Sequence, residues 1–192
     1  MLIPRPESEQ LVAQTINYVR KLGIEHPRIA DIGTGSGAIA ISIALEMPSA
    51  EVFATDISSE ALKVAQMNAH KLGAEVEFTQ GNLMGTLQGK FDIIVSNPPY
   101  IQSQVIKSLE PEVLREPRIA LDGGPNGTEV ISPLLEEIRK KLKPSYSAAY
   151  VEIDPPIADI ALKTAQAKFS YAEVSILTDL AGLIRCISIE NN

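Results

Sequence analysis

A glycine-rich turn between two apolar stretches is the feature that most limits how this chain can fold. The turn at 33–37 reads Gly-Thr-Gly-Ser-Gly. It follows an apolar run at 28–32 and precedes a stretch at 38–46 that is rich in alanine and isoleucine. A short buried strand that enters a helix through a tight glycine turn is typical of a βαβ unit. The sequence therefore predicts an α/β domain.

The alternation of strand and helix continues along the chain. Apolar or alternating runs predict further strands at 51–56, 75–79, 91–95 and 148–153, with helices over 59–72, 128–142 and 156–168. Repeated units of this kind predict a doubly wound sheet with right-handed crossovers. We also expect an extra N-terminal helix at 7–22, a short helix at 108–115 and a closing antiparallel pair at 171–177 and 183–189. The prediction is one domain over 1–192, built on about seven strands with the last strand antiparallel.

The strand predicted at 91–95 runs into the sequence Ser-Asn-Pro-Pro-Tyr at 96–100. Neither proline has an N–H to donate, so the strand cannot continue as a ladder. Each proline also keeps the preceding residue out of the helical region. We therefore expect Asn97 and the carbonyl of Pro98 on extended, exposed backbone at the carboxyl edge of the sheet, where open α/β sheets bind ligands.

The spacing of the glycines and the acids indicates the kind of cofactor. In a dinucleotide fingerprint the third glycine comes one residue later than it does here. The observed spacing, with Asp31 two residues before the first glycine, resembles the S-adenosylmethionine loop of class I methyltransferases. Asp56 ends the second strand, where a carboxylate could accept hydrogen bonds from both ribose hydroxyls of this cofactor or of NAD. Asn82 could lie on the adenine edge and Leu83 on its face.

The glycine turn and Asn-Pro-Pro-Tyr together resemble the amino-group methyltransferases. These enzymes act on a planar, conjugated NH2: adenine N6, guanine N2 or a glutamine amide. Two acceptors, the side-chain oxygen of Asn97 and the carbonyl of Pro98, can hold both N–H bonds and orient the nitrogen toward a sulfonium methyl. Tyr100 can form a wall beside the planar group.

Five stretches narrow the resemblance to the release-factor glutamine methyltransferases, the HemK family. They are 2–9 (LIPRPESE), 31–40 (DIGTGSGAIA), 96–101 (SNPPYI), 116–124 (EPRIALDGG) and 179–185 (DLAGLIR). The resemblance implies N5-methylation of the glutamine in the Gly-Gly-Gln motif of peptide chain release factors. It also implies catalytic residues Asn97 and Pro98 and substrate-binding residues Arg5, Asn97, Pro98, Pro99 and Tyr100. The cofactor residues that it implies are Asp31, Gly33, Thr34, Gly35, Ser36, Gly37, Asp56, Asn82, Leu83 and Asn97.

The sequence departs from the family pattern in three places. Family members carry an N-terminal helical domain that helps to dock the release factor, and this sequence starts at the Ile-Pro-Arg-Pro arm. Asn82 replaces the usual acid, so we expect weaker cofactor binding without charge assistance. The stretches 142–146 and 152–154 replace Pro-Gly-Gly and Glu-Ile-Gly, and we expect them to change the shape of loops more than the chemistry.

Charge and composition bear on the alternatives. The net charge of −7 argues against unaided binding to a phosphate backbone, so we expect no direct nucleic-acid partner. A nucleic-acid amino methyltransferase that acts on a flipped base stays an alternative. A non-catalytic cofactor-binding subunit is a second alternative. No apolar run reaches about 20 residues, and neither His26 nor His70 has ligand-spaced partners, so no membrane or metal partner is predicted. We expect a monomer in the cytoplasm, or in mitochondria if the source is a eukaryote.

Overall fold

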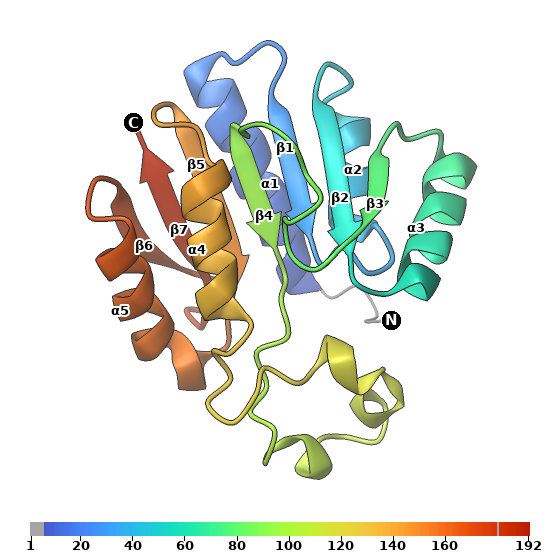
Figure 1. Cartoon of the computed structure of the whole chain (residues 1–192), viewed down its shortest axis with the longest axis vertical. Coiled ribbons are helices and arrows are strands. Elements are labelled where there is room, and N and C mark those ends of the chain that lie inside the picture. The colour runs from blue at the N-terminus through green and yellow to red at the C-terminus, as the bar shows by residue number, and fades with distance from the viewer. Residues whose placement is uncertain (1–5, 180) are drawn as a thin grey trace.

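The computed structural model describes residues 6–179 and 181–192. At its centre lies a seven-stranded sheet with the order β3-β2-β1-β4-β5-β7-β6 (Figure 1). Neighbouring strands from β3 to β5 pair in parallel, whereas β7 runs antiparallel to both β5 and β6. This confirms the predicted doubly wound sheet with an antiparallel last strand. The strands are β1 (Arg28–Ile32), β2 (Glu51–Asp56), β3 (Glu77–Gln80), β4 (Ile93–Ser96), β5 (Ser147–Glu152), β6 (Glu173–Thr178) and β7 (Ile184–Asn191).

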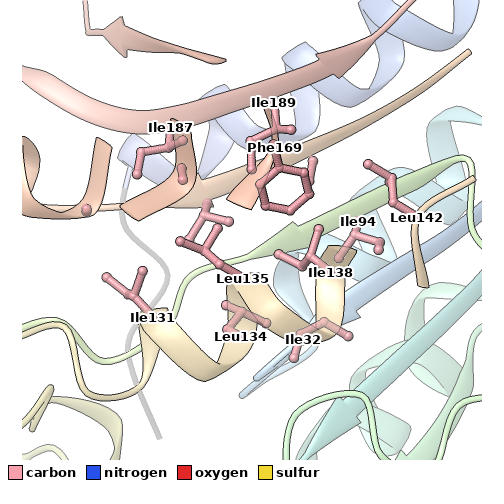
Figure 2. Packing of buried hydrophobic residues seen from close by; sticks show 14 of the residues in the cluster. Ile32, Ile94, Ile131, Leu134, Leu135, Ile138, Leu142, Phe169, Ile187 and Ile189 are labelled. Atoms are coloured by element: carbon pink, nitrogen blue, oxygen red, sulfur yellow. The ribbon is translucent and has the colours of Figure 1, made fainter. Parts of the chain in front are cut away.

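Helices cover both faces of the sheet. One face packs against α1 and α2, through a core that includes Leu11 of α1 and Ile43 of α2. The opposite face packs against α4 and α5, and Figure 2 shows Leu134, Leu135 and Ile138 of α4 against this face. The helices are α1 (Pro6–Leu22), α2 (Ala38–Glu46), α3 (Ser59–Leu72), α4 (Ile131–Lys141) and α5 (Ala158–Lys168).

The two-sided cover explains why the central strands read as continuous apolar runs. Successive side chains of a strand point to opposite faces. In β1, Ile29 belongs to the core under α1 and α2, whereas Ala30 and Ile32 belong to the core under α4 and α5. All three side chains are at most 1% exposed. A parallel strand that is buried on both faces loses the alternation of polar and apolar residues.

The segment 101–127 is irregular, as expected, and lies beyond the carboxyl ends of β1 and β4 (Figure 1). The prediction of one short helix at 108–115 is wrong. Two separate 3₁₀ turns, Ile106–Ser108 and Val113–Arg115, are present instead. Leu109 between them is extended, and Pro111 has no N–H with which to continue a helix. A third 3₁₀ turn, Arg118–Ala120, follows.

Within the described residues, no helix has the length and apolar character needed to cross a membrane.

Candidate functional site

A cavity of about 840 Å³ opens at the carboxyl edge of the sheet. Its floor is formed by the ends of β1, β2 and β4, next to the point between β1 and β4 where the strand order reverses, and its far wall comes from the 101–127 segment and the residues just after it. This volume and position are typical of small-molecule sites in α/β sheets. Of the predicted site residues, the cavity lining includes Gly33, Thr34, Gly35, Ser36, Asp56, Asn82, Leu83, Asn97, Pro98 and Pro99.

The glycine turn wraps over the end of β2. The backbone N–H groups of Gly33 and Thr34 both donate to the carbonyl of Thr55, at 2.8 and 2.9 Å. Gly35 has a φ of +58°, and nothing lies within 4 Å of a Cβ built there, because the residue faces the cavity. Gly37 does not line the cavity. It begins α2 with a φ of +83°, and a Cβ there would lie 3.1 Å from Ala65 Cβ of α3.

Asp31 lies beneath the turn and not on the cavity surface. Its Oδ2 accepts hydrogen bonds from Thr34 Oγ1 at 2.7 Å and from the Ala40 backbone N–H at 3.2 Å. The side chain is fully buried, and this burial raises the pKa of its carboxyl to about 6, against the lowering effect of the two hydrogen bonds. The geometry makes Asp31 a residue that holds the turn against the first turn of α2.

Asp56 holds the other side of the same turn. Its Oδ2 accepts from the Gly35 N–H at 2.9 Å, and its Oδ1 accepts from the Ser58 N–H at 2.8 Å. Ser58 in turn caps α3 by accepting from the Ala61 N–H. An ionised carboxylate has about four lone-pair positions. Asp56 is half-buried at the cavity surface, so both of its oxygens keep acceptor capacity for hydroxyl groups of a ligand.

Asn82 and Leu83 lie on the turn after β3, beside Asp56. The Gly81 N–H donates to the carbonyl of Asp56 at 3.0 Å, which brings this turn to the end of β2. The Asn82 side chain is exposed, whereas Leu83 is half-buried. The cavity therefore has a polar side chain and an apolar side chain next to each other at this end.

The Asn-Pro-Pro-Tyr stretch is more enclosed than expected. Pro98 is buried, and Asn97, Pro99 and Tyr100 are half-buried. The returning chain packs closely on the last of these residues: a Cβ on Gly123 would lie 2.7 Å from Tyr100 Cα, and one on Gly127 would lie 2.5 Å from the Tyr100 carbonyl oxygen. Tyr100 itself faces away from the main cavity and donates its hydroxyl hydrogen to Glu152 Oε1 at 3.2 Å. Arg5, the other predicted substrate residue, lies outside the described residues.

Sequence reasoning gave no role to Ser103, Arg118, Asp122 or Glu129, which line the far wall. Asp122 Oδ1 accepts from Ser103 Oγ at 2.5 Å and from the Gly124 N–H at 3.0 Å, and its Oδ2 accepts from Arg118 Nε at 2.8 Å. These bonds lower the pKa of the Asp122 carboxyl. Asp122, on the chain that returns toward α4, thus holds the chain just after Asn-Pro-Pro-Tyr through Ser103. The sequence signal that could have pointed to this wall is the stretch 116–124, which was used above only for the family resemblance.

The histidines lie away from this site. His26 and His70 are both exposed, and the described residues contain no group of three or more His, Cys, Asp or Glu side chains that could hold a metal ion. The cavity lining supplies backbone groups, amides, carboxylates, hydroxyls, one guanidinium and apolar side chains.

Known proteins with related sequences and structures give an independent comparison. Residues 10–142 match the family described as Methyltransferase small domain. A release factor glutamine methyltransferase from Deinococcus radiodurans is 42% identical over 154 residues, which cover 80% of this chain and 54% of that protein. One from Bacillus cereus is 38% identical over 195 residues, which cover 99% of this chain and 69% of that protein.

A solved structure agrees with these sequence relatives. The protein-(glutamine-N5) methyltransferase of Alicyclobacillus acidocaldarius, described as release factor-specific, aligns with a TM-score of 0.61 at 25% identity. The alignment covers 99% of this chain and 95% of that chain. The chain spans about half to two thirds of the length of the two curated relatives above.

Proposed function

The chain belongs to the release factor glutamine methyltransferases, and on this basis we propose that it methylates the side-chain amide nitrogen, N5, of a glutamine in a peptide chain release factor. The glutamine is that of the Gly-Gly-Gln motif. The observation that carries the proposal is the shared cavity, in which the glycine turn and Asp56 face the same space as Asn97 and Pro98. The alternative of a nucleic-acid base is not favoured, because the sequence relatives carry the release-factor name.

The cavity fits S-adenosylmethionine as the methyl donor. A volume of about 840 Å³ accommodates a cofactor and part of a second molecule. Gly33 and Gly35 leave open space at the turn, where a ligand can approach the backbone. Asp56 supplies acceptors for the ribose hydroxyls, Leu83 an apolar surface for adenine, and the Asn82 amide oxygen an acceptor for the adenine amino group. When bound, the cofactor supplies an electrophilic methyl group on a sulfonium.

The residues at the end of β4 supply orientation. A glutamine amide nitrogen is a poor nucleophile because its lone pair is delocalised. The Asn97 side-chain oxygen and the Pro98 carbonyl accept hydrogen bonds from its two N–H groups. These two bonds hold the nitrogen in line with the methyl carbon. Transfer of the methyl group would form the N–C bond and break the S–C bond, and the electron pair of the broken bond would stay on sulfur. The nitrogen then loses one proton to solvent, so the step needs no strong protein base.

Asn97→Ala separates this role from cofactor binding. With a release factor as substrate, we expect kcat for S-adenosylhomocysteine formation to fall by about 10²- to 10³-fold, the usual cost of one orienting polar group. Calorimetry should show an affinity for S-adenosylhomocysteine close to that of the wild type. Gln104→Ala, an exposed change in the neighbouring loop, is the matched control. Full turnover by Asn97→Ala would refute the role of Asn97, and a wild-type chain that binds no cofactor would refute the proposed function.

A further inference from the structure

Leu83, at the predicted adenine end of the cavity, has an unusual backbone conformation. Its φ is +50°, in the left-handed region that side chains other than glycine rarely adopt. A residue with a branched aliphatic side chain reaches this region at a cost and stays there only when the surrounding structure holds it. The turn that presents Asn82 and Leu83 to the cavity must therefore be fixed by contacts from outside itself.

Two side chains from different elements provide these contacts. Thr55, buried at the end of β2, donates its hydroxyl hydrogen to the carbonyl of Leu83 at 2.8 Å. Glu137 of α4 accepts the next backbone N–H, that of Met84, at 2.7 Å through Oε2. The two hydrogen bonds hold the peptide group that joins Leu83 to Met84, one at its carbonyl oxygen and the other at its N–H. A carboxylate acceptor makes the second bond charge-assisted.

The chain after Leu83 rests on the same helix. The Met84 side chain is fully buried in the core that includes Leu134 and Ile138 of α4, two of the α4 residues that Figure 2 shows packed toward the sheet. Lys141, one turn after Glu137, donates to the carbonyl of Leu87 at 2.6 Å. Glu137 is thus one of several contacts between α4 and the 84–87 stretch, and it is the one adjacent to Leu83.

We propose that Glu137 is a positioning residue for the cofactor. By accepting the Met84 N–H it keeps Leu83 in its left-handed conformation, and so it places the Leu83 side chain and the Asn82 amide against the adenine ring. Glu137 itself does not line the cavity. The inference rests on the proposed use of S-adenosylmethionine and adds a residue on α4 to the residues that determine its affinity.

The neighbouring residue provides a matched control. Glu136 is on the same helix and carries the same charge, but its carboxylate bonds to Arg139 at 2.9 Å and to Lys168 at 3.0 Å. These partners belong to α4 and α5, away from the 81–84 turn. Glu136→Ala therefore removes a carboxylate and its ion pairs without touching the turn, and it controls for general effects on the stability of α4.

The test compares the dissociation constant of S-adenosylhomocysteine for four proteins by calorimetry. Glu137→Ala should raise it by about tenfold, the usual effect of losing a hydrogen bond to a charged group. Glu137→Gln should restore most of the affinity, because the amide oxygen can accept the Met84 N–H. Glu136→Ala should bind as the wild type does. With saturating S-adenosylmethionine, kcat of Glu137→Ala should stay near the wild-type value while KM for the cofactor rises.

Wild-type affinity in Glu137→Ala would overturn the inference. So would an equal loss of affinity in Glu136→Ala, because the effect would then follow helix stability and not the bond to Met84. A wild-type chain that fails to bind S-adenosylhomocysteine would instead refute the proposed function, so the two failures can be told apart.

Discussion

At the scale of single residues, Asp31 shows how a buried carboxyl group can serve a site that it does not line. Its carboxyl holds Thr34 of the turn and the backbone of Ala40 in α2. Among the described residues, its Oδ1 has no hydrogen-bond partner. Burial raises the pKa of this carboxyl from 3.8 to about 6. Its ionisation therefore opposes folding.

The sign of the effect on stability follows from the pKa in each state. Between about pH 4 and pH 6 the folded protein holds a proton on Asp31 that the unfolded chain has lost, so the contribution of Asp31 to the free energy of unfolding falls as the pH rises through this window. Asp31→Asn removes this dependence. We expect the stability of the variant relative to wild type to increase by about 3 kcal/mol from pH 4 to pH 7, measured by urea unfolding. A constant difference would contradict the assignment.

Only some features of single residues could be predicted from the sequence. The position of Asp56 at the end of β2 could be predicted, because it depends only on local order. The bond from the Met84 N–H to Glu137 joins residues 53 positions apart, and no spacing rule connects them. The enclosure of Tyr100 likewise depends on Gly123 and Gly127, which approach its backbone only after the 101–127 segment folds back.

At the scale of elements, the periodic parts of the chain were predictable and the irregular segment was not. Strands such as β1 and β4 are apolar because both faces are covered, and helices such as α4 show the helical repeat. The 101–127 segment has neither period. Side-chain bonds to Asp122 and the glycine contacts at Tyr100 hold its ends, and extended Leu109 and Pro111 interrupt the stretch 108–115, so the local pattern there does not form one helix.

The wall held by Asp122 leads to a prediction about substrate binding. Asp122→Ala removes the acceptor for Ser103, Arg118 and the Gly124 N–H, so the wall opposite Asn97 loses its fixed position. We expect KM for the release factor to rise by about tenfold, with the affinity for S-adenosylhomocysteine unchanged. Steady-state kinetics with each substrate varied in turn would measure this. Glu112→Ala, an exposed change in the same segment, is the control. If cofactor affinity fell and KM for the release factor did not, this account of the wall would be wrong.

At the scale of the whole molecule, the end of the sheet opposite the cavity has a stabilising cluster of its own. Arg28, at the start of β1, lies against the rings of both Phe53 and Phe91, with its guanidinium carbon 4.8 and 4.9 Å from their centroids. It also donates to the carbonyl of Lys90 at 2.9 Å and to Glu51 at 3.2 Å. One side chain thus joins β1, β2 and the chain leading into β4, far along the strands from the ligand edge.

Arg28→Met should separate stability from function. The variant keeps most of the aliphatic stem but loses the stacked charge and its hydrogen bonds. We expect the free energy of unfolding to fall by about 1–3 kcal/mol, measured by urea unfolding at neutral pH. The affinity for S-adenosylhomocysteine should not change, because neither Arg28 nor its hydrogen-bond partners Lys90 and Glu51 line the cavity. A large loss of cofactor affinity would show that the two ends of the sheet are coupled.

The central claim concerns the whole molecule, because the cavity must admit both a cofactor and a protein loop. The most direct measurement is tandem mass spectrometry of a release factor after incubation with this chain and S-adenosylmethionine. The account predicts one added methyl group on the side-chain nitrogen of the glutamine in the Gly-Gly-Gln peptide. In the same incubation time, the methylated fraction should be far smaller with Asn97→Ala. An unmodified glutamine, or a methyl group on another residue, from a chain that binds the cofactor would contradict it.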